Sequence, residues 1–401
     1  MPNIPPFYRQ ALGMAAFWLG VSAPLSAATL KDALDHAWAA NAPAQSARTA
    51  QFDAQEAAAR ALLPEPPTLT LSGRSDQIDR NHGLREWEAE VGVPLWLWGQ
   101  RDRAQRVAQS EREASSQGFI QERWQLAGEL REAWWDVRLA QTELISAELK
   151  LGEATRLEAD VARRVKAGDL APLDLNLARS TLGQAKSERL RSKAALSRAQ
   201  EQFRALSRGA PLPDRDEPLA PAVEPDSHPQ LASLAAKASS AQARLSQASG
   251  DTRNNPELAL TLTRERGSFA DPYQNLAKVS IKIPFGSSSR NQPRITAANA
   301  ELTEAQLSLD TAQRKLAANV SASRAELDQA REASTLQQER LQLAEQSFGW
   351  VEKAFKAGQL DLPALIRAET ELADARLQAA RARTEAARAV SRYNQAVGVL
   401  P

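Results

Sequence analysis

Apolar residues change their spacing along the chain, and the same succession of spacings occurs twice. In four short segments apolar and polar residues alternate, which is typical of β-strands. In the clearest of them Trp87, Ala89, Val91, Val93 and Leu95 share one face. We predict two strand hairpins, at 67–73 with 86–95 and at 257–264 with 276–284, joined by polar loops at 74–85 and 264–274.

After each strand hairpin the apolar spacing alternates between three and four residues, which indicates long packed α-helices. No proline interrupts this pattern from Gln100 to Ala167, a run that extends roughly 100 Å as a helix. A Lys-Ala-Gly turn follows, and a returning helix is predicted over Leu173–Leu206. Alanine occupies many seam positions, which favours close helix packing. A further helix is predicted over Thr29–Leu63, where Pro64 ends it.

The whole pattern is duplicated with an offset of 190 residues. The turn sequence VARRVKAGDLAPLDLNLAR at 161–179 matches VEKAFKAGQLDLPALIRAE at 351–369, and the same register pairs Pro94 with Pro284. A duplication of this extent indicates two copies of one structural unit. We predict a first repeat at 29–208 with a helical hairpin at 100–208, a second repeat at 230–401 with a hairpin at 290–398, and a linker at 209–229, where six prolines indicate a connector rather than a docking motif.

The N-terminus has the features of a secretory signal peptide, predicted over 1–28. Arg9 supplies the positive charge, Ala11–Leu25 the apolar segment, and Ser26-Ala27-Ala28 the cleavage site, with cleavage after Ala27 or Ala28. An uncleaved membrane anchor is the alternative. No later stretch approaches the roughly 20 apolar residues of a membrane helix. The mature chain is therefore predicted in the periplasm, outside the cell, or in an outer membrane as β-structure.

Composition narrows the function classes. Charged residues make up 25% of the chain and aromatic residues 5%, as in long helices and coiled coils. The net charge of +1 provides no field for nucleic acid, and the absence of cysteine excludes disulfides and thiolate metal sites. His36, His82 and His228 lie in different predicted elements, and no phosphate-binding loop or nucleophile motif accompanies them. We predict no enzyme activity, no metal site and no cofactor.

The strand pattern favours a membrane barrel. Barrel strands are about ten residues long, apolar outward and polar inward. A soluble sheet packed on a core is the alternative, but the long helices leave little else to form that core. Four strands cannot close a barrel, so the chain must oligomerise. Trp96 and Trp98 follow the second strand and are predicted at the membrane interface, with packing in a core as the alternative.

Basic residues gather at both helical turns, far from the strands. Arg163, Arg164 and Lys166 precede the first turn, and Lys353 and Lys356 precede the second. Cations suit helix C-termini, so a solvated helix end is the ordinary explanation. Their recurrence at both turns also predicts a docking surface for a partner protein.

The signal peptide, the two strand-and-hairpin repeats and the paired AG(D/Q)L turns together resemble the TolC-like outer membrane factor family over approximately 29–401. The resemblance implies a mainly α fold with a membrane β-barrel. Four strands per chain would join a homotrimeric twelve-stranded barrel that continues as a periplasmic α-helical tunnel. It also implies an outer-membrane efflux duct that works with a periplasmic adaptor and an inner-membrane RND transporter. The segment SIKIPFGSSSRNQPR at 280–294 and the ending VGVLP look most like the CzcC-like branch, which exports heavy-metal cations.

The resemblance further implies that the tip glycines Gly168 and Gly358 belong to the partner-binding turns. In the best-known member acidic residues six and nine positions after the second tip glycine narrow the closed end. Ala364 and Arg367 stand there in this chain, while the first repeat has Asp174 and Leu177. An acidic constriction is therefore in doubt. The candidates for a gate are Asp169, Asp174, Asp361 and Arg367.

Three other functions compete with a metal-efflux duct. A duct for drugs or for type I secretion would have the same architecture. A periplasmic adaptor would carry one helical hairpin flanked by compact β-domains, rather than two hairpins each preceded by a strand pair. A secreted coiled-coil scaffold would have helices without a pore.

Overall fold

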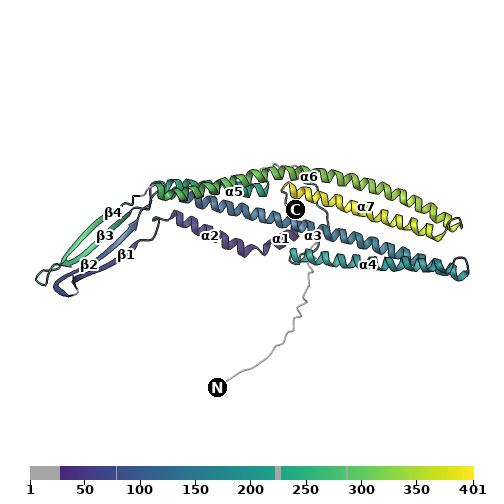
Figure 1. The fold of residues 1–401 in the computed structure, drawn as a ribbon, viewed down its shortest axis with the longest axis horizontal. Helices are drawn as coiled ribbons and strands as arrows, with labels where there is room; N and C mark the ends of the chain where they lie inside the picture. The colour runs from purple at the N-terminus through teal and green to yellow at the C-terminus, as the bar shows by residue number, and fades with distance from the viewer. Residues whose placement is uncertain (1–27, 78, 222–226, 286–287) are drawn as a thin grey trace, which may run out of the picture.

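The computed structural model describes residues 28–77, 79–221, 227–285 and 288–401, so the predicted signal peptide, apart from Ala28, lies outside the described residues. The molecule is elongated, with a sheet at one end and two helical turns at the other (Figure 1). The described helices and strands are α1 Leu30–Ala39, α2 Ala42–Arg60, β1 Thr68–Gln77, β2 Arg80–Pro94, α3 Gln100–Ala167, α4 Pro172–Leu206, α5 Pro229–Gly250, β3 Glu257–Arg266, β4 Gln274–Lys282, α6 Ser288–Lys356 and α7 Leu362–Ala396.

The four strands form one antiparallel sheet in the order β1-β2-β3-β4. Strands β1 and β2 extend well into the predicted loop at 74–85, because their register continues through the pairs Arg74–Glu86 and Ser75–Arg85. The Asp76 carboxylate also accepts hydrogen bonds from the backbone N–H groups of His82 and Leu84, which holds the hairpin end. Beyond the apolar band both faces are polar, so the alternation that marks a strand in the sequence is lost there.

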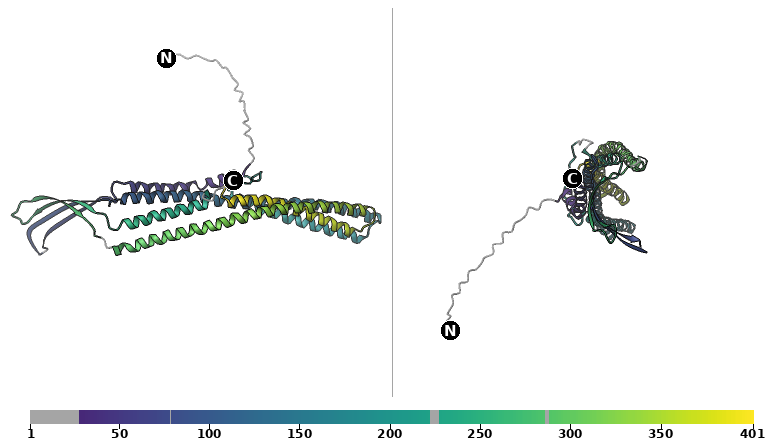
Figure 2. Two further views of the ribbon diagram at one scale, coloured as in Figure 1. Left: turned by 90° about the horizontal axis from the view of Figure 1, so that it is seen from above. Right: turned by 90° about the vertical axis from the view of Figure 1, so that its left-hand side faces the viewer.

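Helices α3 and α6 run the full length of the helical part, and shorter helices accompany them. At the sheet end α2 packs on α3, while α5 packs between α3 and α6. At the opposite end α4 packs on α3, while α7 packs between α3 and α6. Seen along the long axis, these elements form an arc (Figure 2). An arc is the shape that one segment of a tunnel wall would have.

The first predicted helix is two helices. Helix α1 ends at Ala39 and α2 begins at Ala42, with Pro43 in the first turn of α2. Proline suits the first turn of a helix but has no N–H to continue a preceding one, so the chain breaks there. Helix α5 has no counterpart in the prediction, because its Ala- and Ser-rich sequence directly follows the linker prolines and has few large apolar residues.

The main core lies midway along the molecule. Trp134 and Trp135 of α3 are buried with Leu34 of α1 and Phe203 of α4. The Trp134 indole donates a hydrogen bond of 3.2 Å to the carbonyl oxygen of Pro213, so the linker is part of this core. The described part of the linker is therefore a fixed strap across the helices.

Candidate functional site

One face of the sheet is apolar across all four strands. The cross-strand register places Leu69, Val91, Leu260 and Val279 in one row on this face. These side chains are exposed, Val279 by 71% and Leu69 by 66%. The other exposed apolar side chains of this face are Leu71, Trp87, Leu258, Leu262 and Ile281. A continuous exposed apolar band of this kind requires an apolar environment, and a lipid bilayer supplies one.

The opposite face of the sheet is largely polar. Glu90 accepts hydrogen bonds from Thr261 at 3.2 Å and from Lys282 at 3.0 Å. Lys282 also lies 3.7 Å from a carboxylate oxygen of Glu257. Charged side chains that pair with one another, as Glu90, Lys282 and Glu257 do, are typical of the polar face that lines the water-filled interior of a membrane barrel.

Strands β1 and β4 each have an unpaired edge in the single chain. Unpaired backbone groups are not tolerated in the hydrocarbon of a bilayer, so these edges must pair with strands of other chains. The two predicted interface tryptophans lie where the sheet meets the helices. Trp98 is 99% exposed, whereas Trp96 is partly buried and donates a hydrogen bond of 3.2 Å to the Ala61 carbonyl oxygen.

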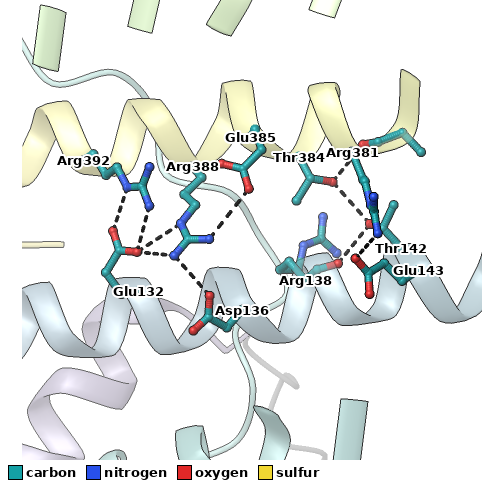
Figure 3. Close-up of polar contacts among 11 residues, drawn as sticks. Glu132, Asp136, Arg138, Thr142, Glu143, Arg381, Thr384, Glu385, Arg388 and Arg392 are labelled. Atoms are coloured by element: carbon teal, nitrogen blue, oxygen red, sulfur yellow. Dashed lines mark hydrogen bonds and ion pairs between the residues drawn. The ribbon is translucent and has the colours of Figure 1, made fainter. Parts of the chain in front are cut away.

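The two helical hairpins meet along a charged seam between α3 and α7 (Figure 3). Arg388 of α7 contacts Glu132 and Asp136 of α3, and Arg392 bonds Glu132 at 3.0 Å. Arg376 continues the series toward the turns, at 2.6 Å from Glu153, and Arg381 pairs with Glu143. Within each hairpin the buried positions are instead small or apolar, such as Ala147 and Ala185 in the first and Leu327 and Ala389 in the second. Ion pairs such as Lys150–Glu188 also join α3 to α4 within the first hairpin. Near the turns the two hairpins share an apolar cluster that includes Val161, Phe355 and Leu362. The junction between the hairpins is therefore charged along most of its length and apolar next to the turns.

Glu369 of α7 lies near this seam without a cation of its own among the described residues. Burial and the neighbouring Glu153 carboxylate raise the pKa of Glu369 to about 7. Charging of this side chain therefore opposes the contact between the two hairpins as the pH rises.

The two tip turns have the same backbone geometry. Gly168 and Gly358 adopt the left-handed conformation with φ of 90° and 71°. In each turn the next residue donates its N–H to the carbonyl oxygen five residues earlier, at 2.9 Å from Asp169 to Arg164 and from Gln359 to Ala354. This is the Schellman arrangement, which glycine accommodates without strain.

The basic residues predicted to bind a partner differ in how free they are. Arg163 and Arg164 both pair with Asp160, and Arg164 also lies over the Phe355 ring at 5.2 Å. Lys356 pairs with Glu352 at 2.7 Å. Lys166 and Lys353 are exposed and have no carboxylate within 4 Å in the described part of the chain. These two lysines are therefore the cations most available to a partner.

Two of the predicted gate residues have a local structural role. Asp174 accepts a hydrogen bond of 3.0 Å from the N–H of Ala171, and Asp361 accepts one of 3.0 Å from the N–H of Ala364. Arg367 donates to the Pro363 carbonyl oxygen at 3.3 Å, within its own helix. Asp169 makes no side-chain hydrogen bond or ion pair among the described residues, although its backbone N–H completes the tip turn.

A depression of about 1000 Å³ lies between α2, α3, α5 and α6, and the sequence did not indicate it. Because α2 and α6 are the outer helices of the arc, a depression lined by both must lie on the concave side. Arg244 of α5 bridges it by pairing with Glu111 of α3 at 2.8 Å and Glu301 of α6 at 3.4 Å. The one sequence feature that could have indicated this depression is Arg244 itself, an arginine within a helix that is otherwise rich in Ala and Ser.

The three histidines remain apart, and in the described ranges no cluster of three metal-binding side chains occurs.

None of the helices in the described ranges is long and apolar enough to cross a membrane.

Comparison with known proteins shows which proteins share this sequence pattern and this architecture. Residues 225–399 match the family model for outer membrane efflux proteins. The cobalt-zinc-cadmium resistance protein CzcC of Cupriavidus metallidurans is 26% identical over 330 residues, which cover 79% of this chain and 77% of that protein. The crystal structure of the outer membrane protein VceC of Vibrio cholerae has a TM-score of 0.76 at 12% identity, covering 92% of this chain and 96% of that one. CusC has a TM-score of 0.75 at 16% identity and covers 92% of both chains.

The family model covers the second repeat, and the 190-residue duplication provides the same unit in the first. The similarity to CzcC extends over most of the chain, and the shared fold includes both the sheet and the helical hairpins. These observations confirm the predicted fold class and the predicted resemblance. Residues 225–399 thus match the outer membrane efflux protein family, and the chain shares the fold of solved outer membrane channels.

Proposed function

We propose that three copies of this chain form a passive efflux duct, anchored in the outer membrane by the sheet and extended into the periplasm by the helices. The observation that carries this proposal is a sheet with an apolar outer face, a polar inner face and two open edges, continued by an arc of helices. Three copies supply twelve strands and pair every edge. Proteins of this family are channels, so energy for transport comes from a partner.

The partners are a periplasmic adaptor and an inner-membrane RND transporter, and the adaptor binds at the tip turns. Exposed Lys166 and Lys353 offer unpaired cations there, next to rigid turns at Gly168 and Gly358. Lys356, Arg163 and Arg164 are also basic, but each forms an ion pair with a carboxylate nearby in its own helix. An acidic or hydrogen-bond-accepting surface on the adaptor fits this arrangement.

The gate lies at the same end. Asp174 and Asp361 hold the starts of α4 and α7, and Asp169 is the carboxylate free to line the opening. The α3–α7 seam provides the movement, because its ion pairs can be exchanged for water at low cost. The apolar cluster of Val161, Phe355 and Leu362 next to the turns must also separate, so this cluster holds the closed state. The Arg367 side chain folds back and donates a hydrogen bond to a carbonyl oxygen in the first turn of its own helix, so it stabilises that turn and does not line the pore.

The cargo is heavy-metal cations. A relative that matches 79% of this chain is a cobalt-zinc-cadmium resistance protein. A duct for drugs or for type I secretion has the same wall and is the second candidate. In either case the concave depression with Arg244, Glu111 and Glu301 faces the transported solute.

Deletion and fractionation test the proposal. The protein should fractionate with the outer membrane as a detergent-resistant trimer, and its deletion should sensitise cells to zinc, cobalt or cadmium. A soluble monomer would refute the duct, and sensitivity to dyes alone would favour the drug-efflux alternative. Lys166→Glu with Lys353→Glu should weaken export at unchanged trimer yield, while unchanged export would refute docking through the basic tips.

A further inference from the structure

Three arginines lie together on the outward face of the sheet, at the end far from the helices. Arg85 of β2 and Arg266 of β3 are direct cross-strand partners. Arg264 lies two residues from Arg266 and pairs with Trp87 in the register. Because side chains alternate along a strand, all three point to the same side as the apolar band.

No carboxylate neutralises this cluster. Among the described residues none of the three guanidinium groups has an acidic oxygen within 4 Å, and Glu86 and Glu265 alternate to the opposite face. Like charges directly opposite each other on a sheet are destabilising. The cluster is therefore a positive patch that is open to an anion from outside the chain.

The cluster is also held in place. Arg266 donates a hydrogen bond of 3.0 Å to the Gly83 carbonyl oxygen and lies 5.3 Å from the centre of the Phe269 ring. Arg264 and Arg266 each lie 4.9 Å from the centre of the Tyr273 ring. These contacts with carbonyl and ring faces leave the remaining guanidinium N–H groups available to an anion.

The position of the cluster matches the headgroup layer of a membrane. Arg264 follows Leu262 on the apolar face by two residues, roughly 7 Å along the strand. Trp87 and Tyr273, which lie beside the cluster, are residue types that favour the membrane–water interface. Arg264 lines a depression of about 520 Å³ together with Leu71, Trp87 and Leu262, and its polar lining includes Glu88 and Thr263, which alternate to the opposite face. The apolar side of this depression, beside a cationic cluster, suits one acyl chain beneath a charged headgroup.

We propose that Arg85, Arg264 and Arg266 form a binding site for the phosphate of a phosphorylated lipid in the outer leaflet of the outer membrane. Guanidinium groups match phosphate oxygens in planar, bidentate geometry, which favours arginine over lysine at such sites. This inference rests on the proposed function, because it requires the sheet to span the outer membrane with its hairpin turns outward.

Lipid retention by the purified trimer tests the site. The full-length protein is reconstituted in phosphatidylcholine nanodiscs containing a minor fraction of diphosphoryl lipid A, and bound lipid is counted by native mass spectrometry. Arg85→Gln with Arg264→Gln should lower retention of lipid A on the order of tenfold, and added salt should reduce the difference. Arg266 is left intact because it also holds the Gly83 backbone.

Arg74→Gln is the matched control, since Arg74 lies at the same end of the sheet but on the inward face. Equal retention by the double variant and the wild type would overturn the site, and so would an equal loss in the Arg74 control. If inorganic phosphate displaced lipid A as completely as excess lipid A does, the cluster would be a site for free anions, and the proposed lipid site would also be overturned. Metal export and trimer yield, measured in the same variants, separate this failure from failure of the duct itself.

Discussion

Arg131 provides the sharpest test of how the linker is fastened to the helices. Its side chain is 2% exposed and that of Glu217 is 9% exposed, and the two pair at 2.9 Å. The Arg131 guanidinium also bonds the Gln395 side chain and donates to the Val399 carbonyl oxygen at 3.0 Å. One residue of α3 therefore holds the linker and the C-terminal segment together.

Arg131→Met keeps the volume but leaves the Glu217 carboxylate buried without its cation. Breaking one partner of a buried pair costs about 3–5 kcal/mol. Ser391 still donates to Glu217 at 2.6 Å, which places the expected cost near the lower end, about 3 kcal/mol. The linker should then open locally about 150-fold more often, since each 1.36 kcal/mol is a factor of about ten.

Amide hydrogen exchange measures this opening directly. The N–H of Ala220 donates to Asn394 at 2.9 Å, so its exchange rate reports linker release. The double variant Arg131→Met with Glu217→Leu removes both charges and should recover most of the protection, because replacement of a whole buried pair by apolar groups is nearly neutral. Exchange accelerated less than about fivefold in the single variant, or an equal defect in the double variant, would refute the reasoning.

Three further outcomes are expected. The folded-state pKa of Glu369, about 7, lies above its ordinary value of 4.5, so the folded state holds the proton more tightly and stability falls as the pH rises from about 4.5 to about 7. Glu369→Gln should abolish this dependence and raise stability above pH 7 by about 1–2 kcal/mol, after allowance for solvent screening, in thermal melts across that range. Gly168→Ala should cost about 1–2 kcal/mol through its positive φ and increase protease cleavage at the tip, whereas Gly152→Ala, within α3 and with open space around its Cβ, should not destabilise. Arg388→Gln should lower the thermal midpoint more than Arg392→Gln, because the Arg388 side chain is 13% exposed and that of Arg392 43%; the reverse order would contradict the description of the seam.

The periodic and capped parts of the fold could be predicted from the sequence. Helix α4 begins at Pro172, one residue before the predicted start, and ends at Leu206 as predicted. Helix α7 spans Leu362–Ala396, the matching positions of the second repeat. Proline in the first turn and glycine in the preceding turn mark these boundaries by backbone geometry alone. Because equivalent positions in the two repeats are 190 residues apart, a helix or strand predicted in one repeat is also predicted at the matching positions of the other.

The polar features could not be predicted, because each depends on residues far apart in the chain. Arg388 and Glu132 form an ion pair only after the two hairpins dock, and in the sequence both resemble ordinary solvated helix positions. Arg85 and Arg266 are separated by an entire helical hairpin, and only the β2–β3 register places them opposite each other. The strand ends were missed for a related reason, since two polar faces leave no alternation to detect.

The two tip turns also show how a duplicated unit can change its chemistry and keep its shape. A full capping box uses an acceptor at the first position and an acidic side chain three residues later. The first turn keeps only the second half, Asp174 bonding Ala171, and the other keeps only the first half, Asp361 bonding Ala364. Either half suffices to start the helix, so the two turns keep one backbone shape while their side chains differ. The charge displayed at the tips can therefore vary between the repeats without loss of the turn.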